Sequence, residues 1–197
     1  MRAVSFSELD WATAPMPDSS GDVSLARLPQ LGDGGFRAFV RFPPGWRRAV
    51  AGSYPAAEEI LILEGDLAMN GATWREGAHV WAPADALRED SASAAGCLAF
   101  AWFAGRPRWR RGAVVAAAAI AGLAHWREVD RRLGPFGPDS RLLRPDPPHE
   151  SWLIQGGWEG EAAGTTESLS LADRSWRAAQ LGERVAVAGP AFLRILR

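Results

Sequence analysis

The 197-residue chain contains no lysine, one cysteine, one tyrosine and three histidines. The absence of lysine excludes Schiff-base chemistry and catalysis by a lysine base, and all 22 basic residues are arginine. The lone Cys97 can form no disulfide within the chain and no cysteine cluster around a metal. Polar chemistry in this protein therefore depends on arginines, carboxylates and a few imidazoles.

The chain also lacks a strong net charge and a long apolar run. Its formal net charge is −1, which implies no attraction to nucleic acid or to an anionic membrane. The longest apolar run, residues 112–124, is too short to span a bilayer. The opening "MRAVSFSELDW" lacks the apolar core of a signal peptide. We therefore expect a soluble, cytoplasmic protein with neither a nucleic-acid nor a membrane partner.

Apolar and aromatic residues, by contrast, are plentiful. Apolar residues make up 47% of the chain, which is ordinary for a globular protein, but ten tryptophans are many for this length. Large aromatic side chains fill barrel interiors and subunit interfaces. They also line ligand pockets, so the composition leaves both interpretations open.

Residues 23–103 have the pattern of an all-β domain. Short apolar runs recur about every ten residues with turn signals between them, which is typical of a sandwich or barrel. Asn70-Gly71 is the strongest hairpin signal in the chain. The predicted strands lie in residues 36–42, 59–65, 66–74, 78–83 and 97–103.

The remaining sequence predicts a linker and a second β region. "RPRWRR" (106–111) is a basic break containing proline, and residues 113–133 have a helix-forming composition. Strand patterns return in residues 151–158, 166–173 and 191–197. We predict an N-terminal barrel over 1–105, a linker with a helical segment over 106–133 and a shorter β unit over 134–197.

A weak internal repeat relates the two β regions. "EILILEGDLAMNGATWREGAHVWAP" has a counterpart in "ESLSLADRSWRAAQLGERVAVAGP". In both segments a glutamate begins an alternating strand, Trp-Arg follows the turn, and a glycine precedes a strand that ends at proline. Two related β units are therefore expected, the second one shorter.

The first β region resembles the cupin superfamily through its first motif. In that family a glycine is followed after five residues by His-x-His, then by a glutamate and, seven positions later, by a glycine. Here Gly45, Glu58 and Gly65 match, while Ala51 and Ser53 stand at the histidine positions. An alternative register would place Gly52 and Tyr54 there, which also supplies no imidazole.

The second cupin motif is matched in part. Gly77 and Pro83 fit, Asp85 replaces a glycine, and Arg88 stands where the family has its last histidine. The "EEILILEG" strand and the "GC" before the last strand of this region are similar to ChrR-like cupins, which often contain two barrels. The resemblance implies a jelly-roll β-barrel, a degenerate second cupin unit (a bicupin) and a homodimer.

Metal binding by such a site is not expected. Cupin metals are held by several imidazoles and one carboxylate, and a guanidinium offers no lone pair to a metal. We therefore predict no cofactor, with a transition metal held by Glu58 and His79 as the weaker alternative. His125 and His149 are expected to be exposed.

A buried Glu58 needs a partner, because an unpaired carboxylate in an apolar interior is costly. We predict that Glu58 pairs with Arg88, directly or through water, where the metal would have been. Strand alternation then turns Ile60 and Ile62 inward with Glu58. Further pocket candidates are Arg41, Tyr54, Trp81 and Trp102, together with Phe39 and Phe100.

Three functions remain open from these residues. The first is a metal-independent cupin that binds a small, partly apolar ligand in its barrel, and this is the interpretation we favour. The second is a cupin enzyme, either isomerase- or epimerase-like, with Tyr54 and Glu58 as acid and base, or a metal-dependent dioxygenase. The third is a non-catalytic structural or interaction barrel, since barrel interiors can be filled by side chains.

Overall fold

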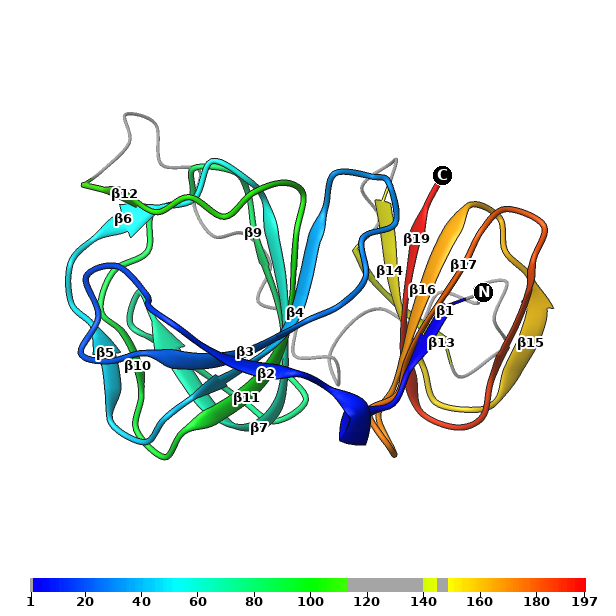
Figure 1. The fold of residues 1–197 in the computed structure, drawn as a ribbon, viewed down its shortest axis with the longest axis horizontal. Coiled ribbons are helices and arrows are strands. Elements are labelled where there is room, and N and C mark those ends of the chain that lie inside the picture. Colours follow the sequence, from blue (N-terminus) through cyan, green and yellow to red (C-terminus); the bar gives the residue numbers. More distant parts are fainter. Residues whose placement is uncertain (1, 113–139, 145–148) are drawn as a thin grey trace. The chain divides into compact units, whose positions relative to one another are not determined.

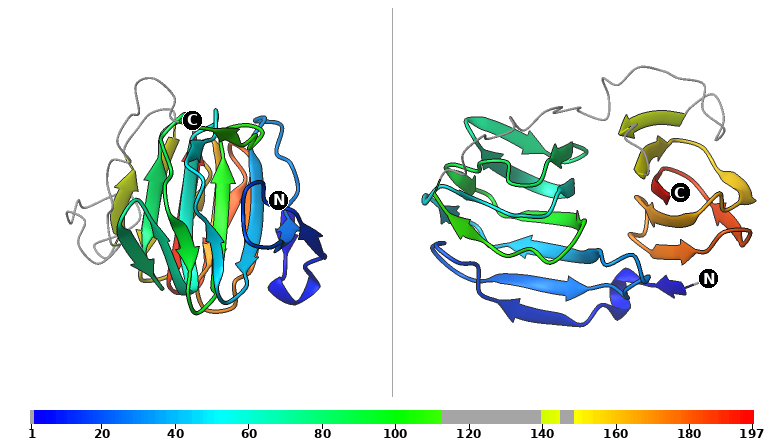
Figure 2. Two further views of the ribbon diagram at one scale, coloured as in Figure 1. Left: turned by 90° about the vertical axis from the view of Figure 1, so that its left-hand side faces the viewer. Right: turned by 90° about the horizontal axis from the view of Figure 1, so that it is seen from above.

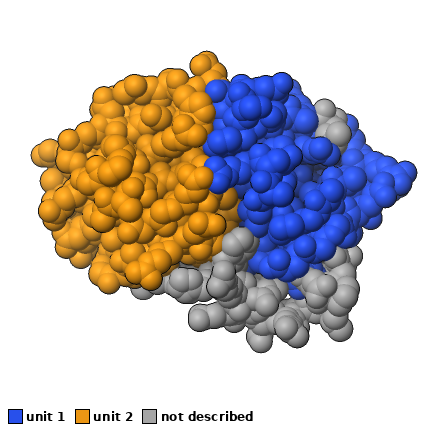
Figure 3. Space-filling model, turned by 90° about the horizontal axis from the view of Figure 1, so that it is seen from below, with its two compact units in different colours: residues 1–9, 126–197 blue, residues 10–125 orange. Residues whose placement is uncertain are grey.

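The computed structural model describes residues 2–112, 140–144 and 149–197, in which nearly all regular structure is β-strand. The helical segment expected in residues 113–133 lies outside the described residues. The chain divides into two compact units (Figure 3): unit 2 comprises residues 10–125, and unit 1 comprises residues 1–9 and 126–197. No helix in the described residues has the length and apolar character that a bilayer span requires.

Unit 2 is a curved antiparallel β structure (Figures 1 and 2). Its main sheet has the order β2-β3-β4-β11-β7-β10-β5, with β8 and β9 also paired to β7, and β6 pairs separately with β12. The strands are β2 (Trp11–Ala14), β3 (Val23–Arg27), β4 (Phe36–Phe42), β5 (Trp46–Arg48), β6 (Gly52–Ser53), β7 (Glu58–Met69), β8 (Ala72–Arg75), β9 (His79–Ala82), β10 (Ser91–Ser93), β11 (Cys97–Phe103) and β12 (Arg110–Arg111).

Strand β7 connects the parts of this unit. Its first half pairs with β9 and β11, and its second half pairs with β8 and β10. The strand changes partners after Gly65, whose backbone adopts a φ of 71°, and the β7–β11 register shifts just before it, between Ile62 and Glu64. A Cβ built on Gly65 would lie 1.9 Å from the carbonyl oxygen of Gly96. Only glycine permits this close approach and this conformation together.

The predicted hairpin is confirmed. β7 turns into β8 through Asn70 (φ 55°) and Gly71 (φ 75°), which are flanked by the cross-strand pair Met69 and Ala72. Positive φ at both central residues is the requirement of the type I′ turn that Asn-Gly favours. Strands β4 and β11 also coincide with the predicted ranges 36–42 and 97–103.

Unit 1 is a second antiparallel β structure. Its six-stranded sheet has the order β1-β17-β16-β19-β14-β13, and β15 pairs with β18. An apolar cluster centred on Trp152, Leu193 and Ile195 forms its core. The strands are β1 (Arg2–Val4), β13 (Ser140–Arg144), β14 (His149–Ile154), β15 (Trp158–Glu161), β16 (Thr165–Ser170), β17 (Trp176–Ala179), β18 (Arg184–Val187) and β19 (Ala191–Leu196).

The internal repeat corresponds to similar hairpins in the two units. β7 and β8 form one hairpin, and β16 and β17 form the other. The Trp-Arg pairs noted in the sequence lie on the second strand of each hairpin. Trp74 lies opposite Leu67, and Trp176 lies opposite Leu169. Both tryptophans are buried, so the repeated sequence pattern marks a repeated packing position.

The unit boundaries differ from the predicted ones at both ends of unit 2. Residues 2–9 belong to unit 1 rather than to the N-terminal barrel, because β1 pairs with β17 from Arg2 to Val4. Residues 106–112 were expected to begin a linker, yet β12 pairs with β6 and Trp109 packs against the core of unit 2. Short strands of two or three residues give too little periodicity to be recognised in the sequence.

The close approach at Gly65 predicts that Gly65→Ala destabilises the protein by about 3–5 kcal/mol, because the added methyl group collides with the Gly96 backbone. Gly71→Ala is the matched control: its φ is also positive, but a Cβ there meets nothing within 4 Å. That variant should lose only about 1–2 kcal/mol, the cost of a left-handed non-glycine residue. Urea unfolding measures both, and equal losses would contradict the role assigned to Gly65.

The buried Cys97 leads to a prediction about thiol reactivity. Burial, together with the nearby carboxylates of Asp66 and Glu64, raises the pKa of the Cys97 thiol to about 12. The native protein should therefore not react with 5,5′-dithiobis(2-nitrobenzoate) at about pH 8, because thiol exchange requires the thiolate. Protein unfolded in guanidinium chloride is the positive control. Rapid labelling of the native chain would show that β11 opens more readily than its pairing indicates.

Candidate functional site

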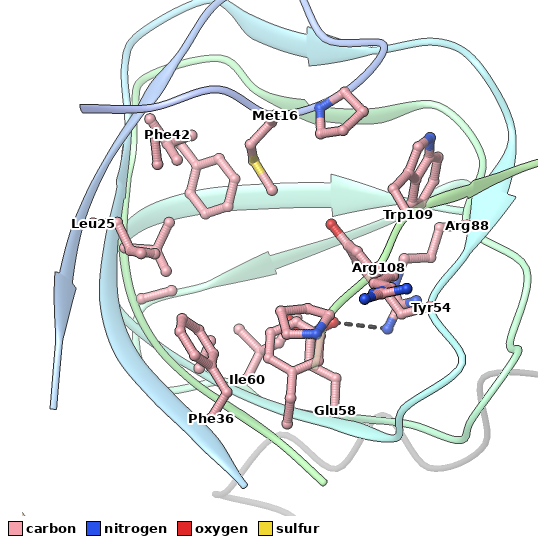
Figure 4. Close-up of a pocket in the computed structure, with 18 of the residues that line it drawn as sticks. Met16, Leu25, Phe36, Phe42, Tyr54, Glu58, Ile60, Arg88, Arg108 and Trp109 are labelled. Carbon is pink, nitrogen blue, oxygen red and sulfur yellow. Dashed lines mark hydrogen bonds and ion pairs between the residues drawn. The ribbon is translucent and has the colours of Figure 1, made fainter. Parts of the chain in front are cut away.

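Unit 2 encloses a cavity of about 550 Å³, a volume typical of small-molecule sites. Figure 4 shows its mixed lining, with Leu25, Phe36 and Phe42 on one side and charged groups on another. Strand alternation explains the apolar wall, because every second residue of a strand faces the same side. The apolar residues include Val23 and Leu25 of β3, Phe36, Val40 and Phe42 of β4, Ile60 and Leu67 of β7, and Ala99, Ala101 and Phe103 of β11.

Glu58 and Arg88 form an ion pair in the wall of this cavity (Figure 4). Arg88 Nη2 donates to Glu58 Oε2 at 2.7 Å, and both residues are buried. The predicted pairing is thus confirmed. Burial raises the pKa of the Glu58 carboxyl, and the positive charges of Arg88 and Arg48 oppose that rise.

Backbone contacts hold Arg88 in place from two directions. Arg88 and Gly52 exchange backbone hydrogen bonds of 2.8 and 3.1 Å. The Asn70 side chain donates to the carbonyl of Leu87 and accepts from the amide of Glu89, so it bonds on both sides of Arg88. The Asn-Gly turn of the β7–β8 hairpin therefore also positions the charged residue of the cavity.

Arg48 is a second buried arginine of the cavity, and our sequence analysis missed it. Its Nη1 donates to the Tyr54 hydroxyl at 3.0 Å, and its guanidinium lies 3.7 Å from the centroid of a Trp109 ring. The Arg88 guanidinium lies 4.7 Å from the centroid of the Tyr54 ring. These cation–π contacts stack the two guanidiniums against aromatic faces.

A signal for Arg48 was present in the sequence. Trp46 and Arg48 are separated by one residue in "WRR", so they share a face of β5. Both are buried, while Arg47 between them is exposed. An inward tryptophan therefore implied an inward arginine. Trp109 was missed for a different reason, since its segment was assigned to a linker.

The sequence-predicted residues divide between the two faces of the sheet. Tyr54, Glu58, Ile60 and Arg88 line the cavity. Ile62 is buried in the adjoining apolar cluster without being part of the lining.

Arg41, Trp81 and Trp102 do not line the cavity. Arg41 and Trp102 alternate with the lining residues Val40 and Ala101, so they face the opposite side of the sheet. Arg41 stacks on the ring of Trp11 at 4.3 Å. Phe39 and Phe100 also lie outside the lining and contact each other, with ring centroids 5.5 Å apart.

The weaker metal alternative, Glu58 with His79, is not supported by the geometry. His79 Nε2 lies 3.2 Å from Glu59 Oε1. Glu58 and Glu59 are consecutive strand residues, so their side chains project to opposite faces. The imidazole is therefore on the side of the sheet away from the cavity.

The donor set around Glu58 also does not fit a transition metal. Ala51 and Ser53 stand at the expected ligand positions and bring no imidazole, and the Arg88 guanidinium offers no lone pair. In residues 2–112, 140–144 and 149–197, no group of three or more histidine, cysteine, aspartate or glutamate side chains converges. The wall instead carries one carboxylate beside two guanidiniums, whose N–H groups are hydrogen-bond donors.

Unit 1 has a hollow of its own, of about 520 Å³, bordered by Trp158, Ser168, Asp173 and Arg177 among other residues. His149, expected to be exposed, is half-buried on β14 and its Nδ1 lies 2.8 Å from Arg194 Nη2. Arg194 also donates to Glu167 at 2.7 Å. His125 lies outside the described residues.

No protein-family model matches the chain, and no curated protein sequence is significantly similar to it. Solved structures do match. A proposed dioxygenase from Nostoc punctiforme aligns over 100% of this chain and 82% of its own, with 13% identity and a TM-score of 0.73. The Escherichia coli protein YlbA (12% identity, TM-score 0.56) and hazelnut vicilin (8%, 0.57) each cover 98% of this chain and 85% of their own. At such identities the likeness concerns the fold alone, and that fold is the cupin jelly roll.

Proposed function

We propose that the protein is a metal-independent cupin that binds a small, partly apolar molecule in the cavity of unit 2. The observation that supports this most directly is a cavity of about 550 Å³ whose wall contains a buried Glu58–Arg88 pair, with Arg88 at the motif position of a histidine ligand. Apolar walls with a few convergent polar groups are the usual composition of a ligand pocket. The cavity also argues against a purely structural barrel, because the interior of such a barrel would be filled by side chains.

The enzyme alternative is favoured by one observation, the raised pKa of Glu58. Against it, Glu58 is held by Arg88, and the Tyr54 hydroxyl accepts a hydrogen bond from Arg48. The candidate base, Glu58, is therefore already engaged by a cation. No histidine belongs to the described lining that could assist them. Binding without a reaction therefore accounts for more of the geometry.

We further propose that the protein is a ChrR-like cupin with two related units. The residues that support this are the "EEILILEG" strand in β7 and the repeated hairpins β7–β8 and β16–β17. Unit 1 would then be the degenerate copy. The function is proposed for the cavity of unit 2 alone, because the buried Glu58–Arg88 pair lines that cavity, whereas the buried Glu167–Arg194 pair of unit 1 is not part of the described lining of the hollow there.

Occupancy of the cavity is tested with N-phenyl-1-naphthylamine, an uncharged fluorophore whose emission rises in apolar surroundings. Saturable binding is expected for the wild type. Leu25→Trp should weaken it by about tenfold or more, because the larger side chain enters the cavity from β3. Thr13→Trp is the matched control, since Thr13 is exposed on β2 and outside the lining. Equal affinities in both variants would place the probe elsewhere and refute the proposal.

Metal independence is tested by mass spectrometry of untagged protein incubated with Fe, Mn, Ni or Zn and then desalted. Metal well below one ion per chain is expected, because the described lining of the cavity offers one carboxylate and no imidazole. Binding of the fluorophore should be the same before and after treatment with a chelator. Stoichiometric metal would contradict this part of the proposal and would favour the oxygenase or isomerase alternative.

A further inference from the structure

The charged groups of the unit 2 cavity are strongly unbalanced. Among the described residues that line it, five are arginines and one, Glu58, is a carboxylate. The whole chain, in contrast, has a formal net charge of −1. Positive charge is therefore concentrated at this cavity. The arginines are Arg27, Arg48, Arg88, Arg106 and Arg108.

The two buried arginines of the lining, Arg48 and Arg88, have N–H groups without a hydrogen-bond acceptor among the described residues. Arg88 directs one nitrogen, Nη2, to Glu58, and Arg48 directs Nη1 to the neutral Tyr54 hydroxyl. Within the described part of the chain, Arg88 Nε, Arg88 Nη1, Arg48 Nε and the Ser91 hydroxyl are buried without a hydrogen-bond partner. Buried donors without an acceptor are rare and costly in native proteins. Two carboxylates act on these charges: Glu58 hydrogen-bonds Arg88, while Asp18 interacts with Arg48 electrostatically but is itself bound by Arg111 and Trp109. The unused donors of Arg48 and Arg88 therefore suit a further anionic acceptor.

The surroundings restrict the chemistry of that acceptor. Stacking on Tyr54 and Trp109 fixes the planes of the two guanidiniums, whose edges suit the two oxygens of a carboxylate. Glu58 is adjacent and would repel a doubly charged phosphate more than a singly charged carboxylate. The rest of the lining is mostly aliphatic and aromatic, including Leu25, Phe36 and Ile60.

The three exposed arginines of the lining are placed to attract an anion to the cavity. Arg27, Arg106 and Arg108 line the cavity and are exposed. Nearby acids are already paired: Asp18 binds Arg111 and Trp109, and Asp85 lies 3.3 Å from Arg110. Exposed cations around an apolar cavity raise the local concentration of an anionic ligand and speed its association.

We propose that the ligand of this cavity is a carboxylic acid with an apolar, aromatic or aliphatic body, whose carboxylate is bound by Arg48 and Arg88. The proposal rests on the proposed binding function and specifies the class of ligand. Arg48 makes the larger contribution to anion binding, because its charge is not shared with Glu58 through a hydrogen bond.

The test compares 2-naphthoate with 2-naphthamide, which has nearly the same shape and no charge, by titration calorimetry at neutral pH. The wild type should bind the acid at least about tenfold more tightly than the amide, because a buried guanidinium gains a charge-assisted pair only with the acid. Arg48→Met should weaken binding of the acid by about tenfold or more, while the affinity for the amide should stay within about twofold of the wild-type value. Arg47→Met, on the exposed face of the same strand, should change neither affinity.

Equal affinity of the wild type for acid and amide would overturn this inference even if Arg48→Met failed to fold. An equal loss of both ligands in Arg48→Met would overturn it as well. If N-phenyl-1-naphthylamine still binds in these cases, the proposed apolar site survives and only the carboxylate specificity fails. If neither naphthyl compound nor the fluorophore binds, the proposed function fails together with the inference.

Discussion

The architecture of unit 2 depends on one close backbone contact, the approach of Gly65 to Gly96. It allows β7 to pair with β9 and β11 in its first half and with β8 and β10 in its second. One strand can thereby contribute to both walls of a barrel, which is a common role of glycine and bulges in curved sheets. The bend leaves Glu58 and Ile60 on the cavity side, and it brings the hairpin turn at Asn70 to the segment that carries Arg88.

The Glu58–Arg88 pair occupies two positions at which the resemblance to cupins implies metal ligands. Glu58 lies on the cavity side of β7, and Arg88, which repels cations, stands at the motif position of the last histidine. A buried ion pair is weak evidence of stabilisation, because the cost of desolvating two charges is comparable to their attraction. In the proposed function the pair contributes to recognition together with the neighbouring Arg48, which in the described residues hydrogen-bonds the Tyr54 hydroxyl rather than a carboxylate.

The similar structures restrict the fold and leave the activity open. The matched proteins include a proposed dioxygenase and hazelnut vicilin, so proteins with very different descriptions share this fold. Function on such a fold follows from the side chains of the site rather than from the sheet order. In this chain the distinguishing features are arginines in an apolar cavity and the absence of imidazoles from its described lining.

Local patterns in the sequence determined much of unit 2. Alternation, the Asn-Gly turn and the register of Gly45, Glu58, Gly65 and Gly77 were sufficient for β4, β9 and β11, for the β7–β8 hairpin and for the inward Glu58, because these depend on neighbours along the chain. The partnership of Glu58 with Arg88 also followed, through the motif positions that the two residues occupy.

Other features were decided only by the tertiary structure. The pairing of the N-terminal β1 with β17 and the packing of Trp109 against the core of unit 2 join residues distant in sequence, and the contact of Arg48 with Tyr54 joins two different strand regions. The opposite faces of Arg41, Trp81 and Trp102 required the phase of each strand, which a fully apolar strand such as β11 does not reveal. Long-range pairing and the burial it creates are properties of the assembled sheets, so no local pattern could specify them.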